Sequence, residues 1–249
     1  MRPSKPSSGQ GTSLHEHAHP HRGFETMTFI RSGSLAHHDS AGHESVMGPG
    51  GVQWMTAGSG LIHAEVSPAE FRRDGGPLEI LQLWINLPAA LKMSPPRYVG
   101  LQAGAIPTIG LDGGAARLSL VSGQLCGVTG PVTSLTDVFM SMVDLDTGAS
   151  IALPAPQGRS VLFYVVAGSL DLDGQSVGAG QLVIFSEGDD IAVKALDQAT
   201  VLFGHAATLD EPIVAGGPFI MNTQAEIEQA FSDYRRGRFD GTPISLELG

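Results

Sequence analysis

The 249-residue sequence predicts an all-β protein that consists of two related β units followed by one helix. Its 33 Gly and 16 Pro residues indicate frequent tight turns. Short segments of alternating or β-branched character lie between these turns, as in a sandwich or barrel. A stretch of the first half also recurs in the second half, which indicates two homologous units. With 42% hydrophobic and 16% charged residues, the chain can build a core.

The strand signal is carried by eight segments, which are 25–31, 52–57, 61–65, 78–87, 136–144, 161–166, 181–185 and 200–204. The polar residues 1–14 before them are expected to form a mobile tail. One helix is expected late in the chain, because Thr223 and Glu226 form a capping box. Apolar residues follow at helical spacing, namely Ile227, Ala230, Phe231 and Tyr234. This apolar stripe is expected to lie on a sheet.

The repeat is clearest at two turns. Residues 31–35 (RSGSL) resemble residues 166–170 (VAGSL), and residues 48–58 resemble residues 178–188. A Gly-x-Gly turn before a strand fits the double-stranded β-helix of cupins, which is a jelly-roll barrel. We therefore expect two tandem cupin barrels and a short C-terminal helix. The expected domains are an N-terminal metal-binding cupin domain, 15–130, and a C-terminal cupin domain without metal ligands, 131–249.

Charge and composition exclude several classes of function. The chain has 14 basic and 25 acidic residues, and this balance of −11 disfavours direct binding of nucleic acid. Its basic cluster at residues 235–238 lies near a helix C-terminus, where cations are favoured anyway. No apolar run approaches the roughly 18 residues of a membrane helix, and we expect a cytoplasmic protein. The single Cys126 excludes an internal disulfide and is expected to be a buried, inert thiol.

The histidines indicate a metal centre. Of nine, only His205 lies beyond residue 63. His19 and His21 are separated by one residue, as are His63 and Glu65, and such pairs project from one face of a strand. If the two strands are neighbours, three imidazoles and a carboxylate converge. That set suits one divalent transition metal with one or two positions open for substrate or O2. His15, His17 and His43 are expected to be structural.

The second unit is expected to bind no metal. The residues that the repeat aligns with the two pairs are Pro154, Pro156, Val193 and Ala195. None of these side chains is a metal ligand. One metal per chain is therefore predicted, in the N-terminal half.

The residues around this cluster allow two interpretations each. His37 and Asp39 either shape the mouth of a pocket or form a hairpin turn in which Asp39 caps backbone amides. Residues 53–55 (Gln-Trp-Met) alternate faces, so Trp54 or its neighbours either line the cavity or pack in the core. Glu25 lies four residues after His21, which places it either beside the metal ligands or on a solvated strand face.

Several long motifs resemble the pirin family. They are 19–26 (HPHRGFET), 37–42, 48–58, 62–65, 81–88, 96–98 and 217–223, within a similarity that runs from about residue 19 to 235. The resemblance implies a bicupin whose N-terminal domain holds a single metal, iron in characterised members, through three His and one Glu. The matching positions are His19, His21, His63 and Glu65. Pirins usually carry a longer segment before the His-Pro-His motif, where this chain has its polar tail.

The resemblance implies two main functions. The first is an oxygenase similar to quercetin 2,3-dioxygenase, in which a flavonol binds through its deprotonated 3-hydroxyl, O2 adds, the ring opens and carbon monoxide leaves. Its partners would be a small aromatic substrate and O2, its metal Fe(II) or else Mn, Co, Ni, Cu or Zn, and its base Glu65. The second is a non-catalytic, metal-binding regulator of a transcription factor or metabolic enzyme. Another cupin reaction, such as isomerisation, is a third alternative.

Overall fold

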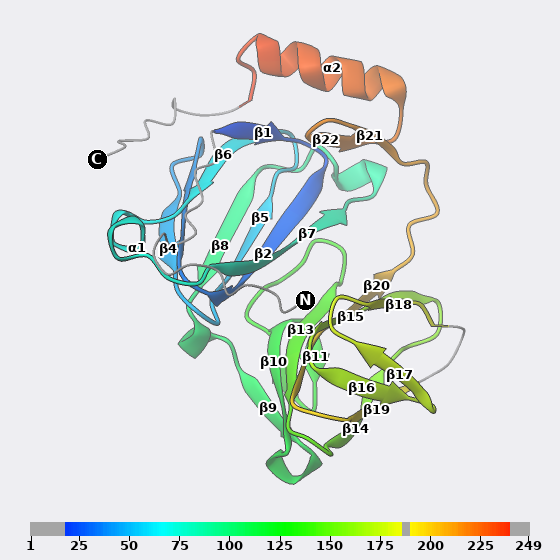
Figure 1. The fold of residues 1–249 in the computed structure, drawn as a ribbon. Helices are drawn as coiled ribbons and strands as arrows, with labels where there is room; N and C mark the ends of the chain where they lie inside the picture. Colours follow the sequence, from blue (N-terminus) through cyan, green and yellow to red (C-terminus); the bar gives the residue numbers. More distant parts are fainter. Residues whose placement is uncertain (1–17, 186–189, 240–249) are drawn as a thin grey trace, which may run out of the picture. The chain divides into compact units, whose positions relative to one another are not determined.

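The protein is described by a computed structural model over residues 18–185 and 190–239, and it is built mainly of antiparallel strands (Figure 1). The expected tail at residues 1–14 lies outside the described part. The chain divides into two compact units. Of the described residues, the first unit contains 18–103 and 211–239, and the second contains 104–185 and 190–210.

The first unit holds a cupin barrel of two four-stranded sheets, ordered β1-β6-β3-β4 and β7-β2-β5-β8. Its strands are β1 (His19–His21), β2 (Phe24–Ser32), β3 (Leu35–Asp39), β4 (Glu44–Met47), β5 (Val52–Thr56), β6 (Leu61–Val66), β7 (Glu79–Asn86) and β8 (Arg97–Leu101). The short helix α1 (Ala69–Asp74) follows β6, and a 3-10 turn (Ala89–Leu91) follows β7. The unit is completed by the hairpin β21 (Val214–Gly216) and β22 (Phe219–Met221) and by α2 (Gln224–Arg235).

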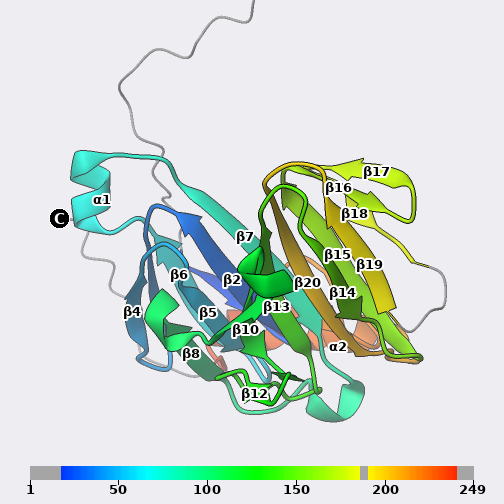
Figure 2. The ribbon, with the colours of Figure 1, turned by 90° about the horizontal axis from the view of Figure 1, so that it is seen from below.

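The second unit repeats this plan with sheets ordered β14-β19-β16-β17 and β18-β15-β20-β13-β10-β9 (Figure 2). Its strands are β9 (Thr108–Leu111), β10 (Ala116–Ser122), β11 (Gln124–Leu125), β12 (Val128–Thr129), β13 (Phe139–Leu145), β14 (Ser150–Pro154), β15 (Arg159–Ala167), β16 (Ser169–Leu172), β17 (Gln175–Gly178), β18 (Leu182–Val183), β19 (Asp190–Ala195) and β20 (Ala199–Ala207). Two 3-10 turns lie at Ala103–Ala105 and Asp112–Gly114. Each of the eight expected strands is present, with ends that differ by a few residues.

The division into units differs in two ways from the expected boundary at residue 130. Strands β9 and β10 belong to the second unit, because β10 pairs with both β9 and β13 along one sheet. Residues 211–239 return to the first unit. There Phe219 forms a parallel bridge with Arg22, so the C-terminal helix belongs to the N-terminal barrel.

The register of the second barrel corrects the alignment that matched Pro154 and Pro156 with the first histidine pair. His19 lies directly opposite His63 in the first unit. Val193, the expected counterpart of His63, lies opposite Ile151 instead of a proline, and Leu153 lies opposite Ile191. These four apolar side chains are buried in the core of the second unit. The positions that correspond to His19 and His21 are therefore Ile151 and Leu153, three residues before the prolines that the repeat indicated.

Helix α2 begins with the predicted capping box. The Thr223 side chain accepts from the Glu226 amide, and the Glu226 carboxylate accepts from the Thr223 amide. The expected apolar stripe is buried through Ile227 and Ala230, which pack with Phe219 on β22. The hairpin β21-β22, and not a larger sheet, is therefore the surface that orders this helix.

Two further expectations from the sequence concern the single thiol and membrane-spanning helices. Cys126 is exposed, which corrects the expectation of a buried thiol, because it occupies the tight turn between β11 and β12 with a φ of 50°. Among the described residues, no helix is long and apolar enough to cross a membrane.

Candidate metal centre

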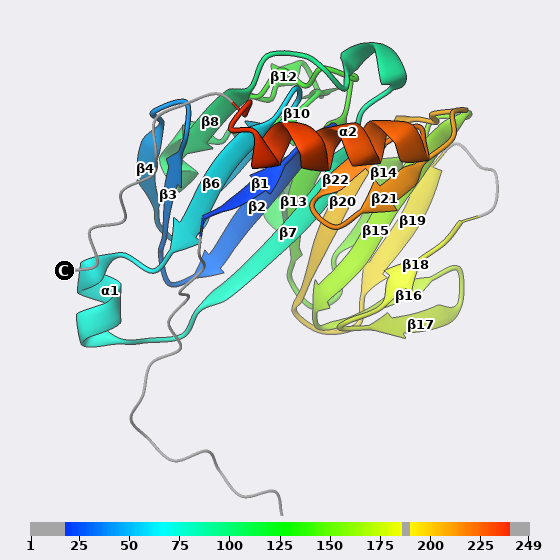
Figure 3. The ribbon, with the colours of Figure 1, turned by 90° about the horizontal axis from the view of Figure 1, so that it is seen from above.

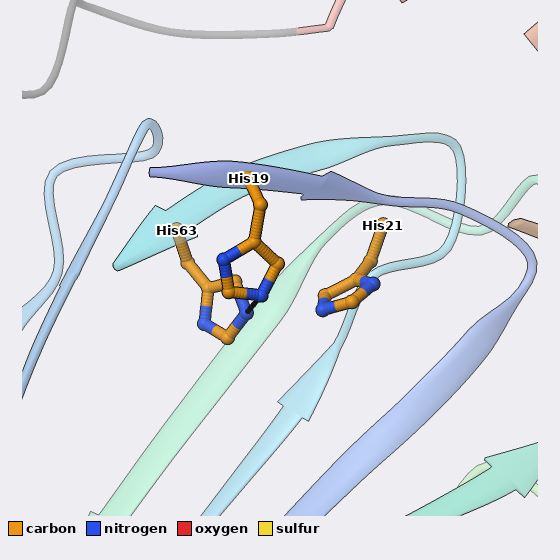
Figure 4. Close-up of side chains that lie close together, drawn as sticks. All are labelled: His19, His21 and His63. Carbon is orange, nitrogen blue, oxygen red and sulfur yellow. Dashed lines mark hydrogen bonds between the residues drawn. The ribbon is translucent and has the colours of Figure 1, made fainter. Parts of the chain in front are cut away.

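Three histidines come together where β1 lies beside β6 (Figure 4). His19 and His21 project from the same face of β1, because they are two residues apart. His63 faces them from β6, and its Nε2 lies 3.0 Å from the Nε2 of His19. The ring of His21 is 4.8 Å from that of His19 and 4.9 Å from that of His63, centre to centre. One potential ligand atom of each residue lies within 4.8 Å of the other two.

Burial keeps two of these imidazoles neutral. His21 is 4% exposed and His63 is 1% exposed. Burial, with a smaller contribution from the nearby His19, lowers the pKa of His21 to about 4, although the Pro218 carbonyl opposes this shift. Burial also lowers the pKa of His63 well below its ordinary value, with help from His21 and His19. A neutral imidazole keeps a nitrogen lone pair, which is what a metal ion requires.

Glu65 lies beside His63, in a second group of potential ligands that also contains His37. Its Oε1 accepts hydrogen bonds from Gln53 Nε2 and Thr28 Oγ1, and its Oε2 accepts from Gln82 Nε2 at 2.7 Å. The four predicted ligands therefore form two overlapping groups, and His63 belongs to both. Two amide donors and one hydroxyl donor, from three different strands, orient the carboxylate within the barrel.

His37 is a further candidate ligand, although its position predicted either a place at a pocket mouth or a hairpin turn. It lies opposite Glu65 in the pairing of β3 with β6, and its Nε2 donates to Asp39 Oδ2 at 3.1 Å. Asp39 Oδ1 also accepts from the amides of Ala41 and His43, so it caps the turn as well. The interpretation as a hairpin turn capped by Asp39 is therefore confirmed, and a role at a pocket mouth stays a prediction. A third i, i+2 pair, His37 with Asp39, was the signal available in the sequence.

Two aromatic side chains, Phe24 and Trp84, lie beside His21 on this face of the barrel. Trp84 lies two residues after Gln82 on β7 and therefore projects from the face that contacts Glu65. Its ring is 5.3 Å from that of His21 and 4.5 Å from that of Phe24, centre to centre. Trp84 is nevertheless 45% exposed, so part of its ring is accessible beside the histidines. Trp84 was not among the residues predicted for the site.

Residues 53–55 and Glu25 divide between the two faces of the sheet. Gln53 contacts Glu65 and accepts from the Tyr98 hydroxyl at 3.1 Å, whereas Trp54 is buried on the opposite face. Glu25 also lies on that opposite face and accepts from Thr56 Oγ1 at 2.6 Å. The interpretation that placed Glu25 beside the metal ligands was wrong, and the other, a solvated face, was wrong too because Glu25 is buried.

His43 belongs to neither group of potential ligands. His43 is partly exposed, and its Nδ1 lies 3.0 Å from Asp39 Oδ2, in line with a structural role. His15 and His17 lie outside the described residues.

The observed residues fit a divalent transition metal. Neutral imidazole nitrogens are good ligands for iron, nickel, copper and zinc, and a carboxylate stands next to them. The Nδ1 atom of His63 is buried and has no hydrogen-bond partner within the described ranges. A buried polar atom without a partner is costly, so a cluster of this kind is typical of a binding site.

Comparison with known proteins identifies the family. Residues 1–85 match the family described as Pirin, and residues 140–240 match the family described as Pirin C-terminal cupin domain. Pirin of Homo sapiens is 37% identical over 227 residues, which cover 88% of this chain and 76% of the human protein. The chain belongs to the pirin family. The predicted resemblance and the two-barrel cupin fold are thus confirmed.

Other pirin-like relatives carry more specific names. A Pseudomonas aeruginosa protein named "putative quercetin 2,3-dioxygenase" is 40% identical over 222 residues, which cover 89% of this chain and 78% of that protein. The crystal structure of quercetin 2,3-dioxygenase from Acinetobacter baumannii superposes with a TM-score of 0.88 at 35% identity and covers 94% of this chain and 82% of its own. A bacterial pirin from Escherichia coli, solved in complex with nickel(II), shares the fold with a TM-score of 0.63 at 23% identity, covering 80% and 79%.

Proposed function

We propose that this pirin-family chain is a metal-dependent dioxygenase that uses O2 on flavonol-type aromatic substrates, with His19, His21, His63 and Glu65 as its metal ligands. The observation that carries the proposal is the convergence of the three imidazoles between β1 and β6. The names of the Pseudomonas and Acinetobacter relatives support this activity. The nickel complex of the Escherichia coli pirin supports a metal in this fold.

One divalent metal per chain is expected, with Fe(II) first and Mn, Co, Ni, Cu or Zn as alternatives. When bound, such an ion would supply Lewis acidity and, if redox-active, electron transfer to O2. The chain's own contribution is a set of neutral imidazole donors. Because burial holds the pKa of His21 near 4, protons compete little for the nitrogen of this residue at neutral pH.

Glu65 is the candidate base. A flavonol must lose the proton of its 3-hydroxyl before it reacts, and a carboxylate can accept that proton. Gln53 and Gln82 hold the two carboxylate oxygens from opposite sides. This keeps the acceptor oriented next to His63 while the substrate arrives.

Trp84 supports an aromatic substrate. A half-exposed indole beside His21 offers a face on which a planar ring can stack. Such a contact would orient the substrate and exclude water from one side of the site. We therefore assign Trp84 a positioning role in binding the flavonol.

The variant Glu65→Gln tests the base role. Protein purified without oxygen is first analysed for metal, and oxygen uptake is then measured with a panel of flavonols and metal in excess. We expect turnover to fall on the order of 10²–10⁴-fold, because an amide cannot accept the proton. Glu44→Gln, on the exposed strand β4, is the matched control and should keep normal turnover.

The outcomes separate the alternatives. Near-normal turnover of Glu65→Gln would refute the base role. Metal-loaded wild type that consumes no oxygen with any flavonol would refute the dioxygenase and favour the metal-binding regulator with a protein partner. Metal analysis should give about one ion per chain, and replacement of both His19 and His21 by Ala should remove it.

A further inference from the structure

The C-terminal strap, which we define as residues 211–239, lies against strand β1 of the candidate metal centre (Figure 3). Phe219 in the strap forms a parallel bridge with Arg22, and the Ile220 amide donates to the Arg22 carbonyl at 3.1 Å. Arg22 follows His21 directly in the chain. The strap is therefore the immediate neighbour of a proposed metal ligand.

The strap also makes a polar contact with that ligand. The Nδ1 of His21 lies 3.3 Å from the carbonyl oxygen of Pro218. A carbonyl can only accept a hydrogen bond, so Nδ1 must carry the proton when this bond forms. The lone pair of the neutral ring is then on Nε2. The partner of one ring nitrogen thus decides which nitrogen is left to bind a metal.

A buried ion pair holds this part of the strap in place. Arg22 donates through Nη1 to Asp233 Oδ2 on α2 at 2.9 Å and through Nε to the Ser59 carbonyl at 2.7 Å. Its guanidinium also lies 4.5 Å from the centre of the Phe239 ring. Asp233 accepts further hydrogen bonds from two side chains of the strap itself, Gln229 and Arg238. The helix is therefore joined to the residue after His21 by a rigid, charged contact.

Close main-chain contacts fix the position of the strap against the barrel of the same unit. Gly23 has a φ of 89°, and a Cβ at this position would lie 2.0 Å from the Ile220 carbonyl oxygen. Lys92 donates through Nζ to the carbonyls of both Gly23 and Ile220, each at 2.9 Å. Pro218 is two residues before Ile220, so these contacts set the position of its carbonyl.

We propose that the C-terminal strap is a positioning element of the metal centre, in which the Pro218 carbonyl selects the Nδ1-protonated form of His21 and the Arg22–Asp233 pair holds that carbonyl in place. The inference rests on the metal centre of the proposed function. Its consequence is that metal affinity depends on a carboxylate of α2 that is not itself a ligand. A partner that lifted the strap would weaken metal binding.

The protonation of His21 is the first test. Nitrogen-15 NMR of the metal-free wild-type protein at neutral pH distinguishes a protonated Nδ1 from a protonated Nε2. We expect His21 to carry its proton on Nδ1. A proton on Nε2 would overturn the proposal, and this measurement requires no variant to fold.

The second test compares two variants that each remove one negative charge from α2. Asp233→Asn breaks the pair with Arg22, whereas Glu228→Gln alters an exposed position of the same helix. Binding of Ni(II) is measured by calorimetry on the full chain. We expect Asp233→Asn to weaken it about 10–100-fold and Glu228→Gln to leave it unchanged, and in Asp233→Asn the His21 proton should be shared between both nitrogens.

The two proposals fail in distinguishable ways. Unchanged Ni(II) binding by Asp233→Asn, with wild type binding normally, would overturn the positioning role alone. Wild type that binds no metal ion would overturn the metal centre and this inference with it. Equal weakening by both variants would also refute the positioning role, because a general charge effect would then explain the loss.

Discussion

Lys92→Met is expected to destabilise the first unit by about 3 kcal/mol. Lys92 is 1% exposed, and its Nζ donates to the carbonyls of Gly23 and Ile220 and to Asn86 Oδ1 at 2.6 Å. Methionine has a similar length but no donor. The variant therefore leaves three acceptors without their donor, one in a buried and two in partly buried hydrogen bonds, and breaks a contact between the C-terminal strap and the main chain before β2.

The magnitude follows from two opposing contributions. Each unsatisfied buried acceptor costs about 1–3 kcal/mol, which gives a loss of about 6 kcal/mol for three. Burial lowers the pKa of Lys92 from 10.5 to about 8, although Glu211 and Glu226 oppose this shift. That shift corresponds to about 3 kcal/mol of unfavourable charge burial, which methionine avoids. The difference is a net destabilisation of about 3 kcal/mol.

Urea unfolding followed by tryptophan fluorescence measures this effect. Both tryptophans of the chain, Trp54 and Trp84, lie in the first unit, so the signal reports on that unit alone. With a urea dependence of about 2 kcal/mol per molar, the midpoint should fall by about 1.5 M. The control Lys194→Met, at an exposed position of β19 in the second unit, should leave the midpoint unchanged.

The pH dependence of the free energy of unfolding shows whether Lys92 is the source of this effect. The unfolded chain keeps the proton of Lys92 up to about pH 10.5, whereas the folded chain releases it near pH 8. Between these values the unfolded state binds more protons, so the stability of wild type rises with pH. The gap between wild type and Lys92→Met should widen by about 2 kcal/mol from pH 7 to 9.5. A gap that does not change with pH, or a variant as stable as wild type, would refute the reasoning.

Three further predictions can be checked by the same unfolding assay on the metal-free protein. Gly23→Ala should cost more than about 2 kcal/mol, because its Cβ would strike the Ile220 carbonyl at a positive φ. Thr223→Ala should cost about 1 kcal/mol through loss of the α2 cap. The pKa of His21 falls from 6.5 unfolded to about 4 folded, so the unfolded chain binds more protons between these values. His21 should therefore account for a loss of about 2 kcal/mol between pH 7 and 5, so His21→Gln should lose about 2 kcal/mol less than wild type, in which the buried His63 adds a loss of its own.

Each of these predictions has a contrary outcome. Full stability of Gly23→Ala would mean that the strap does not approach β2 closely. A Thr223→Ala protein with unchanged stability would show that α2 is held by packing alone. If His21→Gln lost as much stability in acid as wild type does, burial of His21 would not be the source of the acid sensitivity.

Local pattern was sufficient for the strands and for the face of β1 and β6 that gathers the candidate metal ligands. Alternation along a strand decides which side chains share a face, and this holds for His19 with His21 and for His63 with Glu65. The same rule failed for Glu25, because it was carried across residues 22–23. Gly23 adopts a positive φ there, so β1 ends and the alternation starts again in β2.

The repeat likewise predicted two barrels but not their register. Similar turns showed that the two halves share a fold, and the capping box located α2. Loop lengths differ between the halves, so counting from the turns aligned Pro154 with a histidine. Only the cross-strand pairing placed Ile151 opposite Val193.

The sequence by itself determined that this chain is a double cupin of the pirin family with histidines gathered in its first barrel. The tertiary structure alone decided that Pro218 and Asp233, which are 197 and 211 residues from their partners, contact His21 and Arg22. The physical reason is that periodicity encodes the facing of a side chain within its own strand. It carries no information on which distant segment closes over that strand, because such contacts depend on how the whole chain packs.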